Sequence, residues 1–307
     1  MTKEADYLHL VPSNNGPTVV ALGGGHGLAA TLRATRLYAG DITAVVSVAD
    51  DGGSTGRLRA AGERVAPGDL RKCLVALADD SPDAGILAKA MEHRFDNGDL
   101  TGHALGNLML IGLAAQTDDL VQALDVAAGL LNAVGRVLPA TKDPVHLRGQ
   151  LRSGELVDGQ VEVGSHADLS LVSLEPADAE PCAEAILAVA GADQIVLGPG
   201  SLYTSVLAAT AVPGMARAIS ESPAQFVYVC NLHPQAAETE GYDVADHLDA
   251  LARHGLVPDV VLYDPAVMGG GDDIAGAVGT ALARPSGLAH DAELLGAALA
   301  GIAPRPE

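Results

Sequence analysis

A glycine-rich turn close to the N-terminus constrains the fold of this chain more than any other stretch. The apolar run at 19–22 leads into it, and a segment with apolar residues at helical spacing follows it. A strand, a glycine turn and a helix in this order present backbone amides to a phosphate, because glycine permits a positive φ and the close approach of an anion. A tight turn without a ligand is the alternative interpretation. The phosphate-binding hypothesis assigns to the ligand Gly23, Gly24, Gly25, His26 and Gly27.

The bulk composition limits both the fold and the partners. With 307 residues, of which 48% are apolar and 3% aromatic, the chain can build a large aliphatic core. Its net charge of −21 repels nucleic acid and anionic membranes, so we expect neither as a partner. No apolar stretch approaches the length of a membrane span, and the first residues lack the apolar core of a signal peptide. The three scattered cysteines favour reduced thiols in a cytoplasmic protein.

Segments typical of strands alternate with segments typical of helices along most of the chain. Helical periodicity separates apolar, β-branched runs at 41–49, 194–197, 225–231 and 259–263. This order predicts an α/β fold of three layers, in which helices cover both faces of a Rossmann-like, mostly parallel sheet. We expect a flexible tail at 1–16 and a single domain over 17–307, with a small β-rich insertion at about 134–175.

A second glycine turn lies between a buried apolar strand and a helix. Its amides and the hydroxyl groups that follow are suited to bind an oxyanion, although an ordinary capped helix would show the same pattern. In a doubly wound sheet two such turns meet at one crevice. The pair therefore suggests a ligand with two phosphates, such as a nucleoside diphosphate derivative. The residues assigned to the ligand here are Gly198, Gly200, Ser201, Thr204 and Ser205.

Two adjacent aspartates, Asp50 and Asp51, end the second predicted strand. Carboxylate oxygens are ligands for Mg²⁺, so the pair could hold this ion beside the phosphates. Orientation of a nucleophilic hydroxyl, binding of a ribose and a turn that caps the next segment are the alternatives. The polar residues at 54–57 favour a functional role. Three further candidates for ligand contact are Arg71 at a phosphate, Asn107, for which a structural hydrogen-bonded pair is the alternative, and Asn231.

The first turn also fits the dinucleotide fingerprint G-x-G-x-x-A over residues 25–30, with Asp50 as the ribose-binding acid. However, Asp50 is followed at once by a second aspartate and a glycine loop of its own. A second glycine turn follows a later strand, and no partner for hydride transfer is evident. We therefore expect no NAD as a cofactor.

Six longer motifs carry a resemblance to a known family. They are GGGHG, VADDGGSTGRLR, PGDLRKCLVAL, GHALGNLML, ADQIVLGPGSLYTS and VYVCN…ETEGY, in this order. Together they resemble the YvcK-type gluconeogenesis factors, in a superfamily that includes the CofD-type 2-phospho-L-lactate transferases. The resemblance covers about residues 18–254. It implies a three-layer α/β fold, a ligand site at the carboxyl ends of the strands and a homodimer.

For the YvcK type, the resemblance implies a cytoplasmic regulator that binds UDP-sugars such as UDP-N-acetylglucosamine. Such proteins are needed for cell shape and cell-wall synthesis during growth on gluconeogenic carbon, which implies protein partners in wall synthesis. The transferase branch implies the alternative, a Mg²⁺-dependent enzyme that moves a phospholactyl group from a guanylylated donor to a deazaflavin hydroxyl. In that alternative Asp50 and Asp51 are catalytic and hold the Mg²⁺.

The chain departs from the family pattern at four places near the predicted ligand. His26 stands where threonine is usual, Lys72 where asparagine is usual, and Ala289 where arginine is expected. The loop at 233–238 differs from the usual TQPGE. These departures remove loop glycines and a cation near the ligand. They therefore affect which sugar of a UDP-sugar is bound and how tightly, but they leave the predicted fold unchanged.

Overall fold

The structure is a computed structural model that describes residues 16–52 and 66–304. The tail predicted at 1–16 lies outside the described residues except for Gly16. The polar residues at 54–57 also lie outside them.

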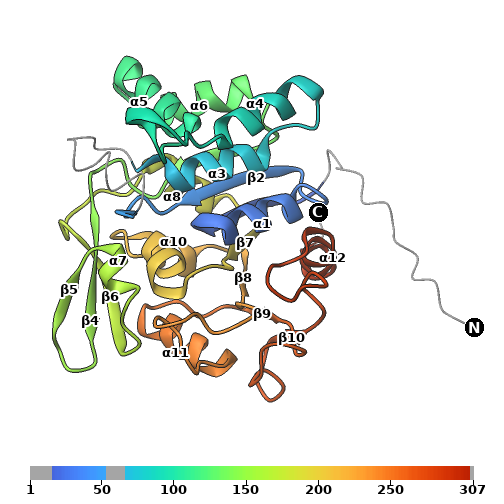
Figure 1. Ribbon diagram of the computed structural model, residues 1–307. Coiled ribbons are helices and arrows are strands. Elements are labelled where there is room, and N and C mark those ends of the chain that lie inside the picture. The colour runs from blue at the N-terminus through green and yellow to red at the C-terminus, as the bar shows by residue number, and fades with distance from the viewer. Residues whose placement is uncertain (1–15, 53–65, 305–307) are drawn as a thin grey trace, which may run out of the picture.

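Parallel strands form a seven-stranded main sheet in the order β10-β9-β8-β7-β1-β2-β3 (Figure 1). This confirms the predicted α/β fold with a mostly parallel sheet. The strands are β1 (Thr18–Gly23), β2 (Asp41–Val46), β3 (Arg136–Pro139), β7 (Gln194–Leu197), β8 (Gln225–Val229), β9 (Val260–Tyr263) and β10 (Ala277–Gly279).

The strand order reverses between β1 and β7. From β1 the chain proceeds through β2 to β3 at one edge, then returns to β7 on the other side of β1 and continues to β10. Because right-handed crossovers leave this point in opposite directions, their helices cover opposite faces of the sheet. The carboxyl ends of strands at such a reversal leave a crevice in which ligands bind.

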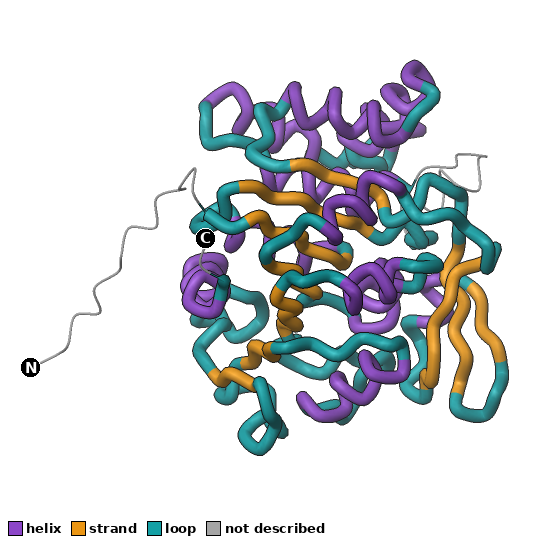
Figure 2. Tube along the Cα trace, turned by 180° about the vertical axis from the view of Figure 1, so that it is seen from behind, coloured by secondary structure: helices purple, strands orange, loops and turns teal. Residues whose placement is uncertain are grey.

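Helices surround this sheet, as Figures 1 and 2 show from opposite sides. In the β1-to-β3 half they are α1 (Gly25–Thr35), α3 (Pro67–Leu77), α4 (Pro82–Glu92), η1 (Gly98–Leu100), α5 (Leu105–Thr117) and α6 (Leu120–Leu130). Later in the chain they are α8 (Ala183–Ala190), η2 (Leu202–Leu207), α9 (Ala208–Thr210), α10 (Met215–Glu221), α11 (Val244–Arg253) and α12 (Ala292–Ile302). Helix α1 contacts both α3 and α12, which brings the end of the described chain to its beginning.

A small antiparallel sheet stands at the side of the molecule away from α12 (Figures 1 and 2). Its order is β5-β4-β6, formed by β4 (His146–Leu151), β5 (Leu156–Asp158) and β6 (Leu169–Glu175), with the short helix α7 (Gln160–Val163) between the last two. The expected insertion began too early, at about 134. Residues 136–139 are β3 and pair with β2 in the main sheet.

Local sequence explains where the later helices begin. The carboxylate of Asp291, the N-cap of α12, accepts the amides of Glu293 and Leu294 at 2.9 and 3.2 Å. Asp243 and Asp246 cap each other at the start of α11 in a capping box. A side-chain acceptor at this position satisfies amides that have no partner within the helix.

The core is aliphatic, as the composition predicts, and runs through all central strands. The three cysteines, Cys73, Cys182 and Cys230, are buried free thiols. Within the two described ranges, no helix combines the length and the apolar character that crossing a membrane requires.

Candidate functional site

The two glycine turns meet at the strand-order reversal. The hydroxyl of Thr31 in α1 donates a hydrogen bond to the carbonyl oxygen of Gly198 at 2.7 Å. A side chain at Gly27 would collide with the carbonyl of Pro199, and one at Gly200 would approach the carbonyl of Gly24 to 3.7 Å. The turn after β1 and the turn after β7 therefore form one surface, as the sequence predicts.

Asn231, directly after β8, joins this surface. Its Oδ1 accepts a hydrogen bond from the amide of Gly200 at 3.0 Å. Its Nδ2 is buried and has no partner among the described residues. An unpaired buried donor costs free energy, so Asn231 is ready to donate a hydrogen bond to a ligand.

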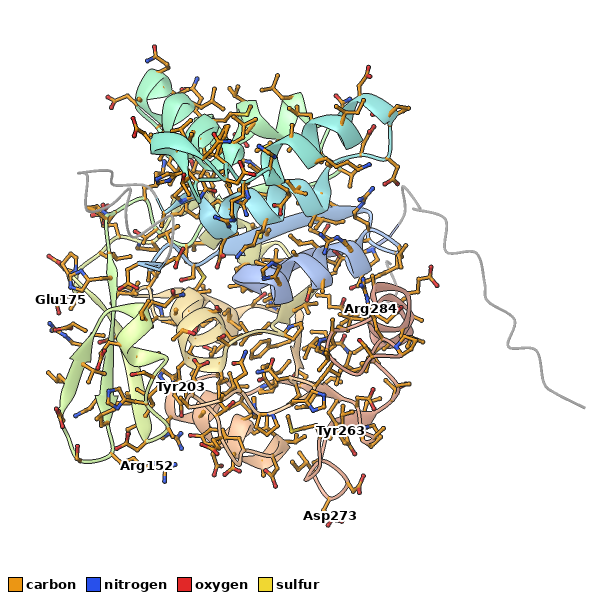
Figure 3. The ribbon with its side chains drawn as sticks, in the orientation of Figure 1. Arg152, Glu175, Tyr203, Tyr263, Asp273 and Arg284 are labelled. Carbon is orange, nitrogen blue, oxygen red and sulfur yellow. The ribbon has the colours of Figure 1, made fainter. Side chains whose placement is uncertain are left out.

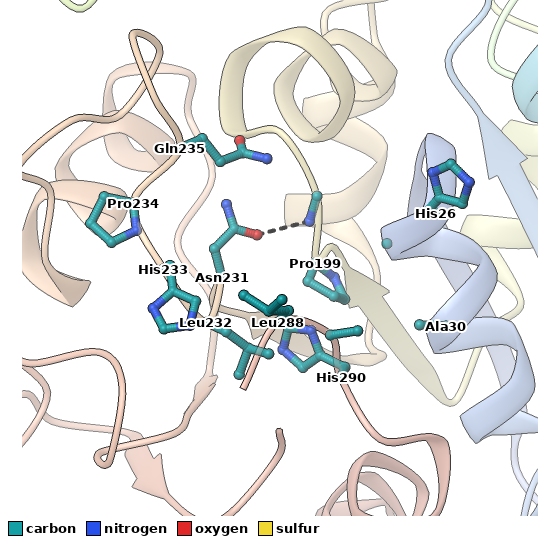
Figure 4. A pocket seen from close by; sticks show the side chains of 13 residues that line it. His26, Ala30, Pro199, Asn231, Leu232, His233, Pro234, Gln235, Leu288 and His290 are labelled. Atoms are coloured by element: carbon teal, nitrogen blue, oxygen red, sulfur yellow. Dashed lines mark hydrogen bonds between the residues drawn. The ribbon is translucent and has the colours of Figure 1, made fainter. Parts of the chain in front are cut away.

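A cavity of about 310 Å³ opens between these elements (Figure 4). In Figure 4, α1 with His26 and Ala30 faces the loop that carries His233, Pro234 and Gln235. The residues that line it are His26, Gly27, Ala30, Pro199, Gly200, Asn231, Leu232, His233, Pro234, Gln235, Leu288, Ala289 and His290.

The start of α1 has the features of an anion site. Gly24 is its N-cap, and no described side chain caps the helix. Gly25 has a φ of 64°, a conformation that suits glycine. The first amides of a helix have no partner within it and carry the positive end of its dipole. His26 in this turn is exposed, and partial burial, followed by the charge of Lys72, lowers the pKa of its imidazole.

A carboxylate stands on the other side of the same turn. A side chain at Gly24 would come within 2.6 Å of Asp69 Oδ2, while Asp69 Oδ1 is paired with Lys72 Nζ at 2.9 Å. A side chain at Gly24 would also come within 3.5 Å of Ser205 Oγ, so Ser205 lies close to this turn. Asp69 and Lys72 therefore border the turn as a neutral pair, a role that was not predicted for either.

The second turn differs from the prediction in how its amides are used. The carboxylate of Glu238 accepts the amides of Tyr203 and Thr204, the start of η2, at 2.8 and 2.7 Å. Burial raises the pKa of Glu238, whereas hydrogen bonds that include one from the Ser201 hydroxyl oppose this rise. Glu238 thus occupies the place at which the sequence predicted a phosphate. Of the residues assigned to this turn, Gly200 lines the cavity, and Ser201 and Thr204 bond Glu238.

Asp50 and Asp51 lie at the same edge of the sheet, after β2, but hold neighbouring backbone. Asp50 Oδ1 accepts the amide of Gly52 at 3.1 Å. The two oxygens of Asp51 accept the amides of Gln160 and Val161 at 2.9 and 3.1 Å, which caps α7 and ties the small sheet to the main one. No three His, Cys, Asp or Glu residues gather as a metal site within 16–52 and 66–304. Asp50 thus forms a local turn, as the alternative has it, whereas Asp51 caps a distant helix and not the next segment.

Arg71 and Asn107 do not line the cavity, and their contacts match the hydrogen-bonded pair given as the alternative for Asn107. Arg71 is buried and donates to Asn107 Oδ1 at 2.9 Å and to Glu92 Oε1 at 3.1 Å. A buried guanidinium needs such partners, so the two residues satisfy each other between α3, α4 and α5.

The wall formed by residues 288–290 was not predicted as part of the site. His233 Nε2 donates to the carbonyl of Gly287 at 2.9 Å and links this segment to the loop after β8. His290 is hydrogen-bonded to the backbone of Cys230, and its Nε2 is buried without a described partner. Burial lowers the pKa of His290 to about 4, so this imidazole is neutral at pH 7. The departure at Ala289 was the one sequence signal close to this wall.

Comparison with known proteins finds relatives over most of the chain. A family model described as 2-phospho-L-lactate transferase CofD matches residues 19–270. A gluconeogenesis factor of Halalkalibacterium halodurans is 43% identical over 250 residues, which are 80% of this chain and 77% of that protein. The gluconeogenesis factor of Bacillus subtilis is 41% identical over 240 residues, 78% of this chain and 75% of that protein. A crystal structure of a UPF0052 family member from Bacillus halodurans is 36% identical with a TM-score of 0.84, covering 92% of this chain and 98% of that chain.

Proposed function

Because the chain belongs to the CofD family and, within it, to the gluconeogenesis factors, we propose that it binds a UDP-sugar in the cavity beside α1. UDP-N-acetylglucosamine is the ligand that the motifs favour. The proposal includes a regulatory role in the cytoplasm, as a homodimer, during growth on gluconeogenic carbon. It also includes partners through which the protein supports cell shape and wall synthesis.

One observation carries the proposal: the uncapped start of α1 lies at a cavity into which Asn231 presents a buried, unpaired donor. A diphosphate fits the helix start, because free amides and the helix dipole both favour an anion there. At about 310 Å³ the cavity is at the small end of the range for ligand pockets, roughly 300–1,000 Å³. It therefore encloses part of a nucleotide sugar and leaves the rest at the surface.

Polar atoms in the cavity suit a base or a sugar with both donors and acceptors. Asn231 Nδ2 donates, and the buried atoms Gln235 Oε1 and His290 Nε2 have no described partner. A neutral imidazole that donates through one nitrogen accepts through the other. Leu232 and Leu288 add apolar surface against which a ring can pack.

A thermal-shift and calorimetry screen of UDP-N-acetylglucosamine, GDP and NAD tests the proposal. We expect the UDP-sugar to stabilise the protein, since a ligand that binds only the folded state raises its melting temperature. Deazaflavin should leave this effect unchanged. Stabilisation by NAD alone would contradict the proposal, as would the absence of any effect of the UDP-sugar.

The match to the CofD family model favours a second candidate, a Mg²⁺-dependent phospholactyl-type transferase. In that case Asp50 and Asp51 would hold the ion, which would neutralise charge on the transferred group. The capping contacts of Asp51 weigh against a shared metal site. Incubation with a guanylylated donor, a deazaflavin acceptor and Mg²⁺ tests this candidate. Formation of a product by wild type, and its loss in Asp50→Asn, would support this candidate. If no product forms, the transferase candidate fails and UDP-sugar binding remains the proposed function.

A further inference from the structure

Helix α5 is apolar on two opposite sides. Its inner side buries Leu110 and packs against the core through Met109 and Leu113. Its outer side carries five apolar residues, none of which is buried in the described part of the chain: Leu105, Leu108, Ile111, Gly112 and Ala115. Their spacing of three and four residues aligns them along the helix. We call these five residues the outer stripe.

The outer stripe faces away from the rest of the molecule. Figure 1 shows α5 at an outer edge, with α3 between it and the main sheet. Side chains project from the outer side of α5 without a neighbouring element (Figure 3). Single exposed apolar residues are common on protein surfaces, whereas a continuous apolar stripe marks an interaction surface.

The charge of the chain favours a second copy on this stripe. From Leu105 to Thr117 the sequence contains no charged residue, although 19% of the whole chain is charged. Two copies that each carry a net charge of −21 repel each other. They can approach closely only through a neutral surface, and the outer stripe is such a surface.

The outer stripe is also complementary to itself in shape. In an antiparallel pair of α5 helices centred near position 110, Leu105 faces Ala115 of the second copy, and Leu108 faces Gly112 of the second copy. Each large side chain meets a small residue, so the two helices interdigitate. A methyl group at Gly112 would meet nothing within 4 Å in one copy, so there is room beside it. Alanine at position 112 would keep a small residue there.

Charges beyond the two ends of α5 match in the same arrangement. Asp118, the exposed C-cap of α5, faces position 102 of the second copy. Arg94 is exposed and donates to the carbonyl of Gly102 at 2.7 Å, so its guanidinium lies at that position. Among the described residues neither Asp118 nor Arg94 forms an ion pair. The antiparallel pair brings them together twice, which favours this orientation and register.

We propose that α5 forms the interface of a homodimer, in which the outer stripes of two copies pack antiparallel about a twofold axis. In a twofold interface the same surface serves both copies, and the outer stripe meets this condition in size, charge and polarity. This inference rests on the homodimer included in the proposed function. It does not depend on the UDP-sugar, because no residue of α5 lines the cavity beside α1.

Sedimentation velocity without nucleotide measures the effect of Leu108→Asp on the dimer. We expect the dissociation constant of the dimer to rise by about a hundredfold or more, because an unpaired carboxylate from each copy would enter an apolar contact. The matched control is Leu187→Asp on α8, where the leucine is 71% exposed. Its dissociation constant should stay within about twofold of that of wild type.

A disulfide tests the register, even where Leu108→Asp disturbs the fold. In the double variant Leu105→Cys, Ala115→Cys, mild oxidation should give a covalent dimer on a denaturing gel. Within one chain the two positions lie about 15 Å apart along α5, too far for a disulfide, so the bond can form only between copies. Ala115→Cys alone should give no covalent dimer, because the two cysteines would also be about 15 Å apart.

The outcomes separate this interface from the rest of the proposed function. A monomeric wild type would overturn both the homodimer and the interface. A dimer that survives in Leu108→Asp, or a double cysteine variant that does not cross-link, would overturn the interface and leave the homodimer. Calorimetry with UDP-N-acetylglucosamine should give the same affinity for wild type and Leu108→Asp. A failure of wild type to bind this nucleotide would contradict the proposed ligand and not the interface.

Discussion

Gly27 in the first turn of α1 lies against the carbonyl oxygen of Pro199, so closely that any side chain at position 27 would collide with it. This contact joins the turn after β1 to the turn after β7 at the point where the strand order reverses. The candidate site depends on this junction, because it brings the amides of α1 and the side chain of Asn231 to one cavity.

Replacement of Gly27 by alanine should destabilise the protein by about 1–3 kcal/mol, the usual cost of forcing extra atoms into a packed contact. Urea unfolding measures the change. Gly112→Ala is the matched control, because a methyl group there would meet nothing within 4 Å in the interior of α5. It should stabilise the protein by about 0.5–1 kcal/mol. A Gly27→Ala protein as stable as wild type would show that the two turns are not packed as described.

Asn231→Asp should separate the two roles of this side chain. The aspartate keeps an acceptor for the amide of Gly200 but loses the Nδ2 donor that faces the cavity. We expect the affinity for UDP-N-acetylglucosamine to fall by about tenfold or more, since the hydrogen bond from Nδ2 is lost and a negative charge is added near the diphosphate. Asn97→Asp makes the same change at an exposed position and should bind normally. Wild-type affinity in Asn231→Asp would remove Asn231 from the site.

The stability of the protein should fall between pH 7 and pH 5 because of two buried histidines. Burial lowers the pKa of His247 and of His290 to about 4, below the usual value of 6.5. Between these values the unfolded chain binds protons that the folded protein does not, so the free energy of unfolding decreases as the pH falls. Each histidine contributes a loss of about 2 kcal/mol at pH 5.

Urea unfolding of wild type, His247→Gln and His290→Gln at both pH values measures these contributions. Each variant should show a pH dependence smaller than that of wild type by about 2 kcal/mol. A variant whose stability falls as steeply as that of wild type would show that the replaced histidine is protonated in the folded state.

Asp51→Ala should loosen the start of α7, where Asp51 accepts the amides of Gln160 and Val161. The loss of an N-cap costs about 1 kcal/mol, so both amides should exchange with deuterium faster, by about fivefold. Asp50→Ala serves as the comparison, because Asp50 accepts the amide of Gly52. Equal exchange at α7 in wild type and Asp51→Ala would argue that Asp51 is not the cap.

Much of the fold could be predicted because periodicity and turn residues are local. Apolar, β-branched runs alternate with helical ones, and Asp291 stands where a helix must satisfy its first amides. The boundary of the insertion was wrong, because a short strand such as β3 alternates in the same way whichever sheet it joins. The meeting of the two glycine turns was predictable from the topology alone.

The partners of polar side chains could not be predicted, because they come from distant parts of the chain. Glu238 caps a helix 34 residues earlier, and Arg71 finds Asn107 36 residues later. The segment at 288–290 lies at the cavity because His233 bonds Gly287 and His290 bonds the backbone of Cys230, far earlier in the chain. The sequence motifs identified residues with many hydrogen-bond donors and acceptors. They did not show whether these groups bond to a ligand or to other parts of the protein.

The structure of the complex with UDP-N-acetylglucosamine tests the central claim most directly. We expect diphosphate oxygens within about 3.2 Å of the amides at the start of α1, and the nucleotide or the sugar in contact with Asn231 Nδ2. A nucleotide bound away from Gly25 and Gly27, or no nucleotide in the cavity at saturating concentration, would contradict the account.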